Sequence, residues 1–263
     1  VRHLGFCDGA ELFDCRFFGL SPAESSGMDP HQRWVLEAGY VALHGAGYKK
    51  GKLMNLVGGV YLGTTATNFG MVSQIPTATG LAASINANRF SFCLGLKGPS
   101  FAIDTEGASS LSAMHAGADG VHALGRGIFN DFSLAGGVHL DVAPNWKPQL
   151  QAAGLLSILG RCFTFDASAD GYIMSDGVAF GVLKPSEQMV DGERMQIEDQ
   201  PLLGTIAGSK VNHNGRSATL GAPSSQAEQE VLVHALGAAA ISSLDIDAVE
   251  CNGDGRFMAD AVE

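Results

Sequence analysis

The 263-residue chain is poor in charged side chains and lacks the long apolar runs of a membrane protein. Asp, Glu, Lys and Arg together make up 16% of the residues, against about 25% in an average globular protein. No uninterrupted apolar run approaches the roughly 18 residues that a membrane-spanning helix needs. The first residues contain no apolar core of a secretory signal. We therefore expect an intracellular protein, cytoplasmic by default, with an organelle left open because the chain starts at Val1 rather than Met.

Cysteine is scarce, and none of its positions is spaced for metal or redox chemistry. The five cysteines are Cys7, Cys15, Cys93, Cys162 and Cys251. No CxxC pair occurs, which excludes zinc ribbons and thioredoxin-type motifs. No Asn-X-Ser/Thr glycosylation acceptor is present either. We expect five reduced thiols, as is usual inside a cell.

Positive charge is also scarce. Lys and Arg number 16 against 27 Asp and Glu, so the formal net charge is −11. Such a chain is poorly suited to binding nucleic acid or an anionic membrane. Phosphate-binding loops, HExxH, GxSxG and GxGxxG motifs are all absent, and the eight histidines have no metal-ligand spacing. We expect no metal site and no bound cofactor.

What the chain does contain is a regular alternation of strands and helices. Apolar residues make up 46% and glycine numbers 35, which favours a packed globular fold with tight turns. The residues 29–47 predict a helix, with Asp29 as N-cap, Pro30 in the first turn and Gly47 at its end. Further helices are expected at 81–96, 108–124 and 224–240, and strands at 56–63, 99–104, 131–138, 177–184, 204–212 and 246–250. This alternation predicts an α/β layered fold, with the polar stretch 185–203 as a surface excursion.

One local arrangement suggests a reactive site. The strand PSFAID at 99–104 runs through Thr105, Glu106 and Gly107 directly into a helix. A sharp strand-to-helix turn points backbone N–H groups at the turn residue, which suits an activated nucleophile and an oxyanion. Spacing alone favours an ordinary strand-to-helix turn, in which Gly107 only supplies a positive φ, because such turns are common in α/β proteins.

The sequence resembles the ketosynthase (β-ketoacyl synthase) domain of polyketide synthases and type I fatty-acid synthases. The matching stretches are 13–48, 85–105, 134–140, 160–184, 208–223 and 245–255. The resemblance implies a thiolase-like α-β-α-β-α layered fold, truncated at both ends, and a dimer. It also implies an N-terminal half over 1–184, a surface excursion at 185–203, and the start of a C-terminal half over 204–263, all as one structural unit.

The resemblance implies a specific chemistry. Family members use a cysteine thiolate to take an acyl chain from the phosphopantetheine arm of an acyl carrier protein. Two histidines then help a malonyl unit to lose CO2 and attack the thioester. The family's elbow motif DTACSSSL corresponds to DTEGASSL at 104–111, which places Gly107 at the nucleophile position. The motif EAHGTGT corresponds to residues 250–256, which places Asn252 at the first histidine position; the second histidine would follow residue 263.

Other positions of these motifs differ as well. Thr105 and Glu106 flank the elbow, and Asp254 and Arg256 replace two threonines that line the pantetheine passage in the family. A charged pair in that passage is costly unless its members bind each other. We expect Asp254 and Arg256 to form a salt bridge that closes the passage.

Residues that keep the family pattern are expected to be structural. Asp176 corresponds to an acidic scaffold position, and the FDxxADG stretch at 165–171 is expected to surround the pocket. Ser109 and Ser110 are expected to hold the first turn of the helix. We expect Cys93 and Cys251 to be buried structural thiols.

The leading hypothesis is therefore a non-condensing ketosynthase-like domain with no intact catalytic residue. An Asn amide donates a hydrogen bond but cannot shuttle a proton. Such a domain would dimerise, with a copy of itself or with an active ketosynthase, or dock an acyl carrier protein. Two alternatives stay open, namely an accessory structural subunit of an unrelated complex and an acyltransferase with a displaced nucleophile.

Overall fold

The computed structural model describes residues 3–65, 68–122, 130–143, 147–190, 193–197 and 202–263. The chain forms two compact units that alternate along the sequence. We call Cys7–Ala143 with Asp176–Gly204 the sheet unit. We call Val1–Phe6, Pro144–Ser175 and Thr205–Glu263 together the terminal unit. The division at 184 and 203 expected from the resemblance stays a prediction.

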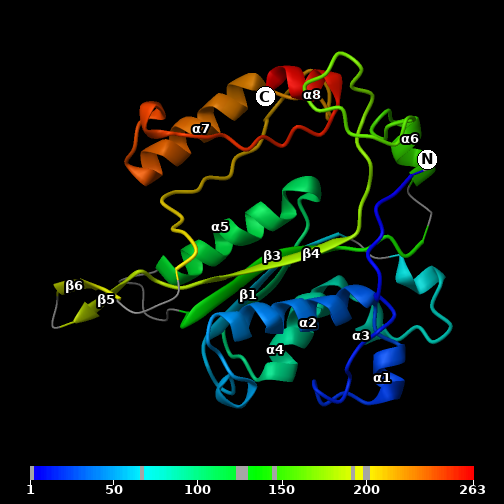
Figure 1. Cartoon of the computed structure of the whole chain (residues 1–263), viewed down its shortest axis with the longest axis vertical. Coiled ribbons are helices and arrows are strands. Elements are labelled where there is room, and N and C mark those ends of the chain that lie inside the picture. The colour runs from blue at the N-terminus through cyan, green and yellow to red at the C-terminus, as the bar shows by residue number, and fades with distance from the viewer. Residues whose placement is uncertain (1–2, 66–67, 123–129, 144–146, 191–192, 198–201) are drawn as a thin grey trace. The chain divides into compact units, whose positions relative to one another are not determined.

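The sheet unit is built on a four-stranded sheet in the order β2-β1-β3-β4 (Figure 1). The central strand β1 (Gly58–Thr64) runs parallel to β2 (Ser100–Ile103) on one side and to β3 (Phe132–His139) on the other. The strand β4 (Gly177–Leu183) pairs antiparallel with β3. The four strands expected between residues 56 and 184 are thereby confirmed.

Helices cover both faces of this sheet, as Figure 1 shows. The helices α2 (Pro30–Gly45) and α4 (Ala83–Leu94) lie on one face, and α5 (Ser109–His122) lies on the other. The predicted α/β layering is confirmed for this unit. Its shorter elements are α1 (Pro22–Ser26), η1 (Lys50–Lys52), η2 (Phe69–Met71), α3 (Ala78–Leu81), η3 (Glu106–Ala108), β5 (Glu187–Val190) and β6 (Glu193–Gln196).

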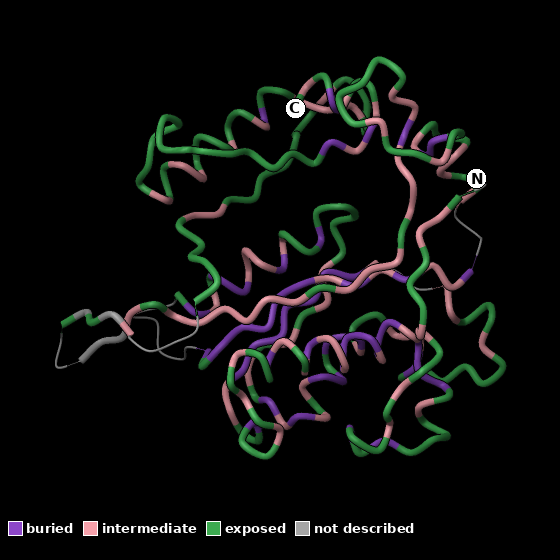
Figure 2. Tube along the Cα trace, viewed as in Figure 1, coloured by how far each residue is buried: buried purple, intermediate pink, exposed green. Residues whose placement is uncertain are grey.

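The core of the sheet unit lies between the sheet and the pair α2 and α4. Leu62 and Leu134 from the strands meet Phe90 and Leu36 from the helices, and all four are fully buried. Figure 2 shows the strands β1 and β3 as nearly continuous buried segments. Such strands are typical of a parallel sheet covered on both faces.

The start of α2 is fixed by the sequence in the expected way. The Asp29 carboxylate accepts a hydrogen bond from the His31 backbone N–H at 2.8 Å, and Pro30 occupies the first turn. Gly47, just beyond the helix, has φ +90°, which a residue with a side chain rarely adopts.

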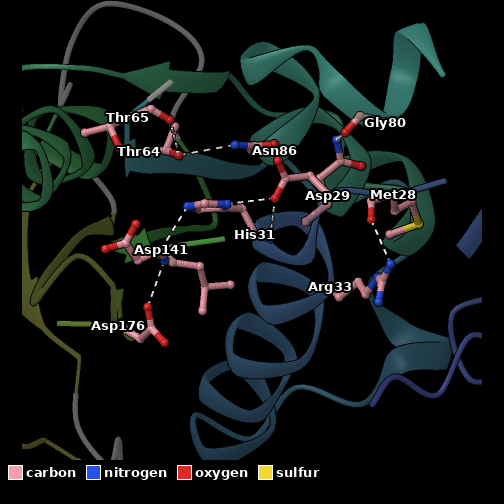
Figure 3. Close-up of polar contacts among 12 residues, drawn as sticks. Met28, Asp29, His31, Arg33, Thr64, Thr65, Gly80, Asn86, Asp141 and Asp176 are labelled. Atoms are coloured by element: carbon pink, nitrogen blue, oxygen red, sulfur yellow. Dashed lines mark hydrogen bonds and ion pairs between the residues drawn. The ribbon is translucent and has the colours of Figure 1, made fainter. Parts of the chain in front are cut away.

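His31 is a packed core histidine that links α2 to the end of β3 (Figure 3). Its Nδ1 lies 2.7 Å from Asp29 Oδ1, and its Nε2 lies 3.0 Å from the backbone nitrogen of Leu140. Because Nε2 accepts the Leu140 N–H, the proton of a neutral ring sits on Nδ1 and is donated to Asp29. The side chain is thus fully used in holding the fold.

Asp176 has the scaffold role expected of it. Its Oδ1 accepts a hydrogen bond from the Asp141 backbone N–H at 2.8 Å (Figure 3), and its Oδ2 accepts one from the Cys7 N–H at 3.3 Å. One carboxylate thereby ties the segment before β4 to the segment after β3 and to residue 7.

The terminal unit has helices but no sheet among the residues that the structure describes. It contains α6 (Lys147–Ala152), α7 (Ser225–Ala239), η4 (Ser243–Asp245) and α8 (Phe257–Val262). The predicted helix at 224–240 is confirmed. The predicted strands at 204–212 and 246–250 are wrong, because no described strand lies beside either segment to accept its backbone hydrogen bonds. Residues 208–212 instead lie against α7: a Cβ atom on Gly208 would meet the Ala235 carbonyl at 2.7 Å, and Asn212 Nδ2 donates to the Ala227 carbonyl at 2.7 Å.

Within the polar stretch 185–203, the strands β5 and β6 pair with each other antiparallel. Residues 191–192 and 198–201 of this stretch lie outside the described residues.

Candidate active site

The predicted strand–turn–helix is present in the sheet unit. Strand β2 ends at Ile103, η3 covers Glu106–Ala108, and α5 begins at Ser109. The Ser109 hydroxyl accepts a hydrogen bond from the Thr105 N–H at 2.9 Å and donates one to the Glu106 carbonyl at 2.7 Å. The Thr105 hydroxyl lies 3.1 Å from that of Ser112. The turn is therefore fixed by hydroxyl groups of its own helix, as expected for Ser109.

Gly107 is exposed at this turn, and its environment is open. A Cβ atom built on Gly107 would meet no other atom within 4 Å. Its φ is not positive, so the interpretation that glycine is needed here for backbone conformation is wrong. The left-handed residue of the turn is Glu106, with φ +52°. For a residue with a side chain this conformation is strained, and such strain is concentrated at functional turns.

The sheet holds the start of α5 at close range. A Cβ atom on Gly63, near the end of β1, would lie 2.6 Å from the backbone of Ser109 and Ser110. Glycine at 63 is required for this approach. The start of α5 is thereby held in place just after the open position of Gly107. The Ala108 and Ser109 backbone N–H groups donate within the turn, to the Thr105 and Glu106 carbonyls.

The second part of the predicted site lies in the terminal unit, which we describe by itself. Asn252 is exposed, and its backbone N–H donates to Glu263 Oε1. The Gly253 N–H donates to Glu263 Oε2 at 2.8 Å. The carboxylate of Glu263 thus binds two successive backbone N–H groups and sets the conformation of the loop that carries Asn252.

A second carboxylate joins this loop to the FDxxADG stretch. The buried Asp260 accepts hydrogen bonds from the Gly255 N–H at 3.1 Å and from the Phe165 N–H at 2.8 Å. The Gly171 N–H donates to the Gly255 carbonyl at 2.9 Å. The expectation that 165–171 is scaffold beside the site loop agrees with these contacts.

The expected ion pair between Asp254 and Arg256 is present. Arg256 Nε lies 2.6 Å from Asp254 Oδ2, and the backbone N–H of Arg256 donates to Asp254 Oδ1 at 3.1 Å. The Asp254 side chain is 17% exposed and that of Arg256 is 35% exposed. Each charge therefore satisfies the other while keeping access to water. That this pair closes a passage stays a prediction.

All five cysteines are free thiols. Cys93, on α4, is half-buried, and burial raises the pKa of its thiol, as in an inert structural cysteine. The expectation that Cys251 is buried is wrong, because its side chain is exposed. Residues 246–250, just before Cys251, form no strand. In the part of the chain that the structure describes, this segment is therefore not covered by neighbouring strands.

Asp260 and Glu263 are the site residues that the sequence analysis missed. They lie three positions apart at the end of the chain, on and just after α8, so both project from one side of the helix. The spacing of three residues between two acidic side chains was the signal in the sequence that could have identified them. Two carboxylates on one helix face, following a glycine-rich loop, have several backbone N–H groups within reach.

Among the described residues, no group of three His, Cys, Asp or Glu side chains could hold a metal ion. No described helix is both long enough and apolar enough to cross a membrane.

Family models settle where the chain belongs. The model of the beta-ketoacyl synthase N-terminal domain matches residues 1–189, and that of the C-terminal domain matches residues 203–263. The chain belongs to the beta-ketoacyl synthase family. This family likeness covers both units and confirms the resemblance found in the sequence.

Curated relatives of this ketosynthase-like chain are polyketide synthases. Polyketide synthase GfsA from Streptomyces halstedii is 37% identical over 272 residues, covering 100% of this chain and 4% of the relative. An erythronolide synthase from Saccharopolyspora erythraea is 35% identical over 269 residues, covering 100% of this chain and 8% of the relative. The chain thus spans only a small part of these relatives.

Solved structures fix the fold of the ketosynthase-like chain. A ketosynthase from module 6 of the bacillaene synthase of Bacillus subtilis 168 superposes with a TM-score of 0.86 at 32% identity. The match covers 97% of this chain and 43% of that chain. A ketosynthase domain from Streptomyces albus matches with a TM-score of 0.85 at 26% identity, covering 99% of this chain and 44% of that chain. The chain accordingly has the thiolase-like α/β fold of ketosynthase domains, and it spans less than half of the solved ones.

Proposed function

We propose that this chain is a non-condensing ketosynthase-like domain that serves a synthase as a dimerising scaffold or as a docking unit for an acyl carrier protein. The observation that carries the proposal is Gly107, which stands at the family's nucleophile position on an intact, exposed elbow. A condensation needs a thiolate there to hold the acyl chain. Glycine has no side chain that could form the thioester.

The histidine position supports the same conclusion. Asn252 stands there, and an amide cannot accept and return a proton as imidazole does. The loop around it is nevertheless held by Glu263 and Asp260. A loop with a fixed conformation and no reactive side chain is what a scaffold role requires. Any phosphopantetheine arm at this domain would belong to a partner carrier protein.

A displaced nucleophile on the elbow helix has little support. The Ser109 hydroxyl already accepts one hydrogen bond and donates another within the turn. Cys93 is half-buried with a raised pKa, so little thiolate is present. Glu106, next to Gly107, is exposed, and its carboxylate would repel the carboxylate of a malonyl group that approached the elbow.

The proposal is tested by intact-mass analysis with a short-chain acyl-pantetheine thioester. We expect the unmodified chain to gain no acyl group. In the variant Gly107→Cys, which has room for the side chain, the thiolate attacks the acyl carbonyl. A new C–S bond then forms, and the pantetheine thiolate leaves and takes up a proton. This variant should gain one acyl group.

The matched control is Ala108→Cys, which places a thiol on the next residue of the same turn. It should react at least about tenfold more slowly, because the proposal assigns the nucleophile to the elbow position alone and reactivity depends on the orientation of the attacking group. An acyl group on a Ser or Cys of the unmodified chain, located by peptide mapping and passed on to an acceptor, would refute the proposal. A Gly107→Cys variant no faster than the control would refute the assignment of Gly107. Co-purification with subunits of an unrelated assembly would favour an accessory structural role instead.

A further inference from the structure

Two asparagines in the terminal unit are followed directly by glycine, and the structure gives them different surroundings. They are Asn214, before Gly215, and Asn252, before Gly253. In such a pair no side chain shields the glycine nitrogen, so this nitrogen can attack the side-chain carbonyl carbon of the asparagine and close a five-membered ring. How readily the ring closes in a folded protein depends on how the reacting groups are held.

At Asn214 both reacting groups have a partner that suits ring closure. The Gly215 backbone N–H, on the attacking nitrogen, donates to His213 Nδ1 at 2.9 Å. Because Nδ1 accepts this hydrogen bond, it carries no proton and can act as a base. The side-chain nitrogen of Asn214, the leaving group, donates to the Ala222 carbonyl at 3.5 Å. A base thus contacts the nitrogen that must lose a proton, and an acceptor orients the group that departs.

The surroundings of Gly215 are open. His213, Asn214 and Gly215 are all exposed, so water reaches each of them. A Cβ atom built on Gly215 would meet no other atom within 4 Å. Its φ of +64° is a conformation that glycine adopts without strain. Among the described residues, no packed neighbour therefore limits the backbone movement that ring closure requires.

The pair Asn252 and Gly253 is held in another way. The Gly253 N–H donates to the Glu263 carboxylate at 2.8 Å, and a carboxylate is a weaker base than imidazole. The Gly253 carbonyl accepts a hydrogen bond from the Thr164 hydroxyl, and a Cβ atom on Gly253 would lie 2.3 Å from Thr164 Cγ2. This glycine is fixed on both sides and packed against a neighbour, so we expect its ring closure to be slower.

We propose that Asn214 is a site of spontaneous deamidation, with His213 as the base. The Gly215 nitrogen attacks the side-chain carbonyl carbon of Asn214, and its proton passes to His213 Nδ1. A new C–N bond forms, the bond from that carbon to the side-chain nitrogen breaks, and the nitrogen takes the proton from His213 and leaves as ammonia. Water then opens the succinimide ring at either of its carbonyls, which gives aspartate or isoaspartate at position 214.

The product alters this segment of the terminal unit. A carboxylate replaces the amide that donates to the Ala222 carbonyl, so two acceptors then face each other and the hydrogen bond is lost. The isoaspartate form also adds a methylene carbon to the backbone between residues 214 and 215. The reacting residues belong neither to the elbow nor to the Asn252 loop, so this modification is independent of whether the chain condenses acyl units.

The test is peptide mapping by mass spectrometry of the folded chain after incubation at neutral pH. We expect the peptide that contains Asn214 to gain the mass difference between an amide and a carboxyl group, as aspartate and isoaspartate forms that chromatography separates. This conversion should be at least about tenfold faster than that of Asn252. In urea the difference should shrink, because the contacts at both sites are lost. Equal rates in the folded chain, or a faster conversion of Asn252, would overturn the proposal.

The variant His213→Ala isolates the role of the imidazole. It should slow the conversion of Asn214 about tenfold or more, because a general base is removed, and His213→Gln, polar but not basic, should behave in the same way. The matched control is His234→Ala, which removes another exposed imidazole of the terminal unit, on α7, and should leave the rate unchanged. Unchanged conversion in both His213 variants, or an equal loss in the control, would refute the role of His213.

Discussion

The two units of this chain differ in what stabilises them. In the sheet unit, strands and helices bury a continuous apolar core that includes Leu36, Leu62 and Phe90. In the terminal unit, the only buried hydrophobic residues among those described are Leu156 and Ala227. The terminal unit is instead fixed by hydrogen bonds from backbone N–H groups to carboxylates.

This difference has a consequence for the two parts of the candidate site. The elbow joins β2 to α5, which packs against the opposite face of the same sheet, with Ala113 of α5 buried against Tyr61 and Ala135. The Asn252 loop depends on a few polar contacts, mainly those of Asp260 and Glu263. Figure 2 shows the helices of the terminal unit as largely exposed or intermediate. We expect local opening to be easier there than in β1 and β3.

The largest expected effect comes from a matched pair of leucines, both in long helices. Leu36, on α2, is fully buried, whereas Leu232, on α7, is 60% exposed. Leu36→Ala should lower the free energy of unfolding by about 3–5 kcal/mol, since it leaves a cavity. Leu232→Ala, with the same change in helix propensity, should cost less than about 0.5 kcal/mol. Urea unfolding of both variants measures the difference; equal losses would contradict the comparison of the two units.

A smaller effect is expected at Asp260. Replacing it with Ala leaves the N–H groups of Phe165 and Gly255 without their acceptors. We expect a local loss of about 2 kcal/mol in the terminal unit, the usual range for hydrogen bonds to a charged group. Hydrogen exchange should accelerate for residues 250–256 and 163–171, and stay unchanged in β1. Acceleration in β1 as well would mean that the two units unfold together.

The smallest effect is a pH dependence in the sheet unit. Partial burial raises the pKa of Glu37 above its ordinary 4.5; the hydrogen bond from the Asp14 backbone N–H opposes this rise, and the Asp14 carboxylate adds to it. The native state then holds this proton more tightly than the unfolded state, so the stabilisation is complete below the ordinary pKa and is lost as the pH rises through the raised one. Glu37→Gln should remove this loss. Thermal unfolding from acid to neutral pH should show the variant gaining stability relative to the unmodified chain; a constant difference would contradict it.

Most elements of the sheet unit were predictable from the sequence, because each carries its own local signal. Asp29, Pro30 and Gly47 mark the ends of α2, and short apolar runs mark the strands. The segments 204–212 and 246–250 carry the same apolar signal, but neither of them forms a strand. A strand needs a hydrogen-bonded neighbour, and a neighbour cannot be deduced from the residues of the strand itself.

Residue identity was enough to establish which side chains are available for chemistry, namely none at Gly107 and an amide at Asn252. It was also enough for the elbow, since the alternation of strand, polar turn and helix is local. The folded arrangement was needed to show that Glu106 rather than Gly107 takes the left-handed conformation, that Cys251 is exposed, and that Asp260 and Glu263 hold the Asn252 loop. The conformation of Glu106 arises within its own turn, from contacts two to four residues apart. The other two outcomes depend on which segments meet in space, as when Asp260 binds the N–H of Phe165, and the residue types do not specify which groups meet.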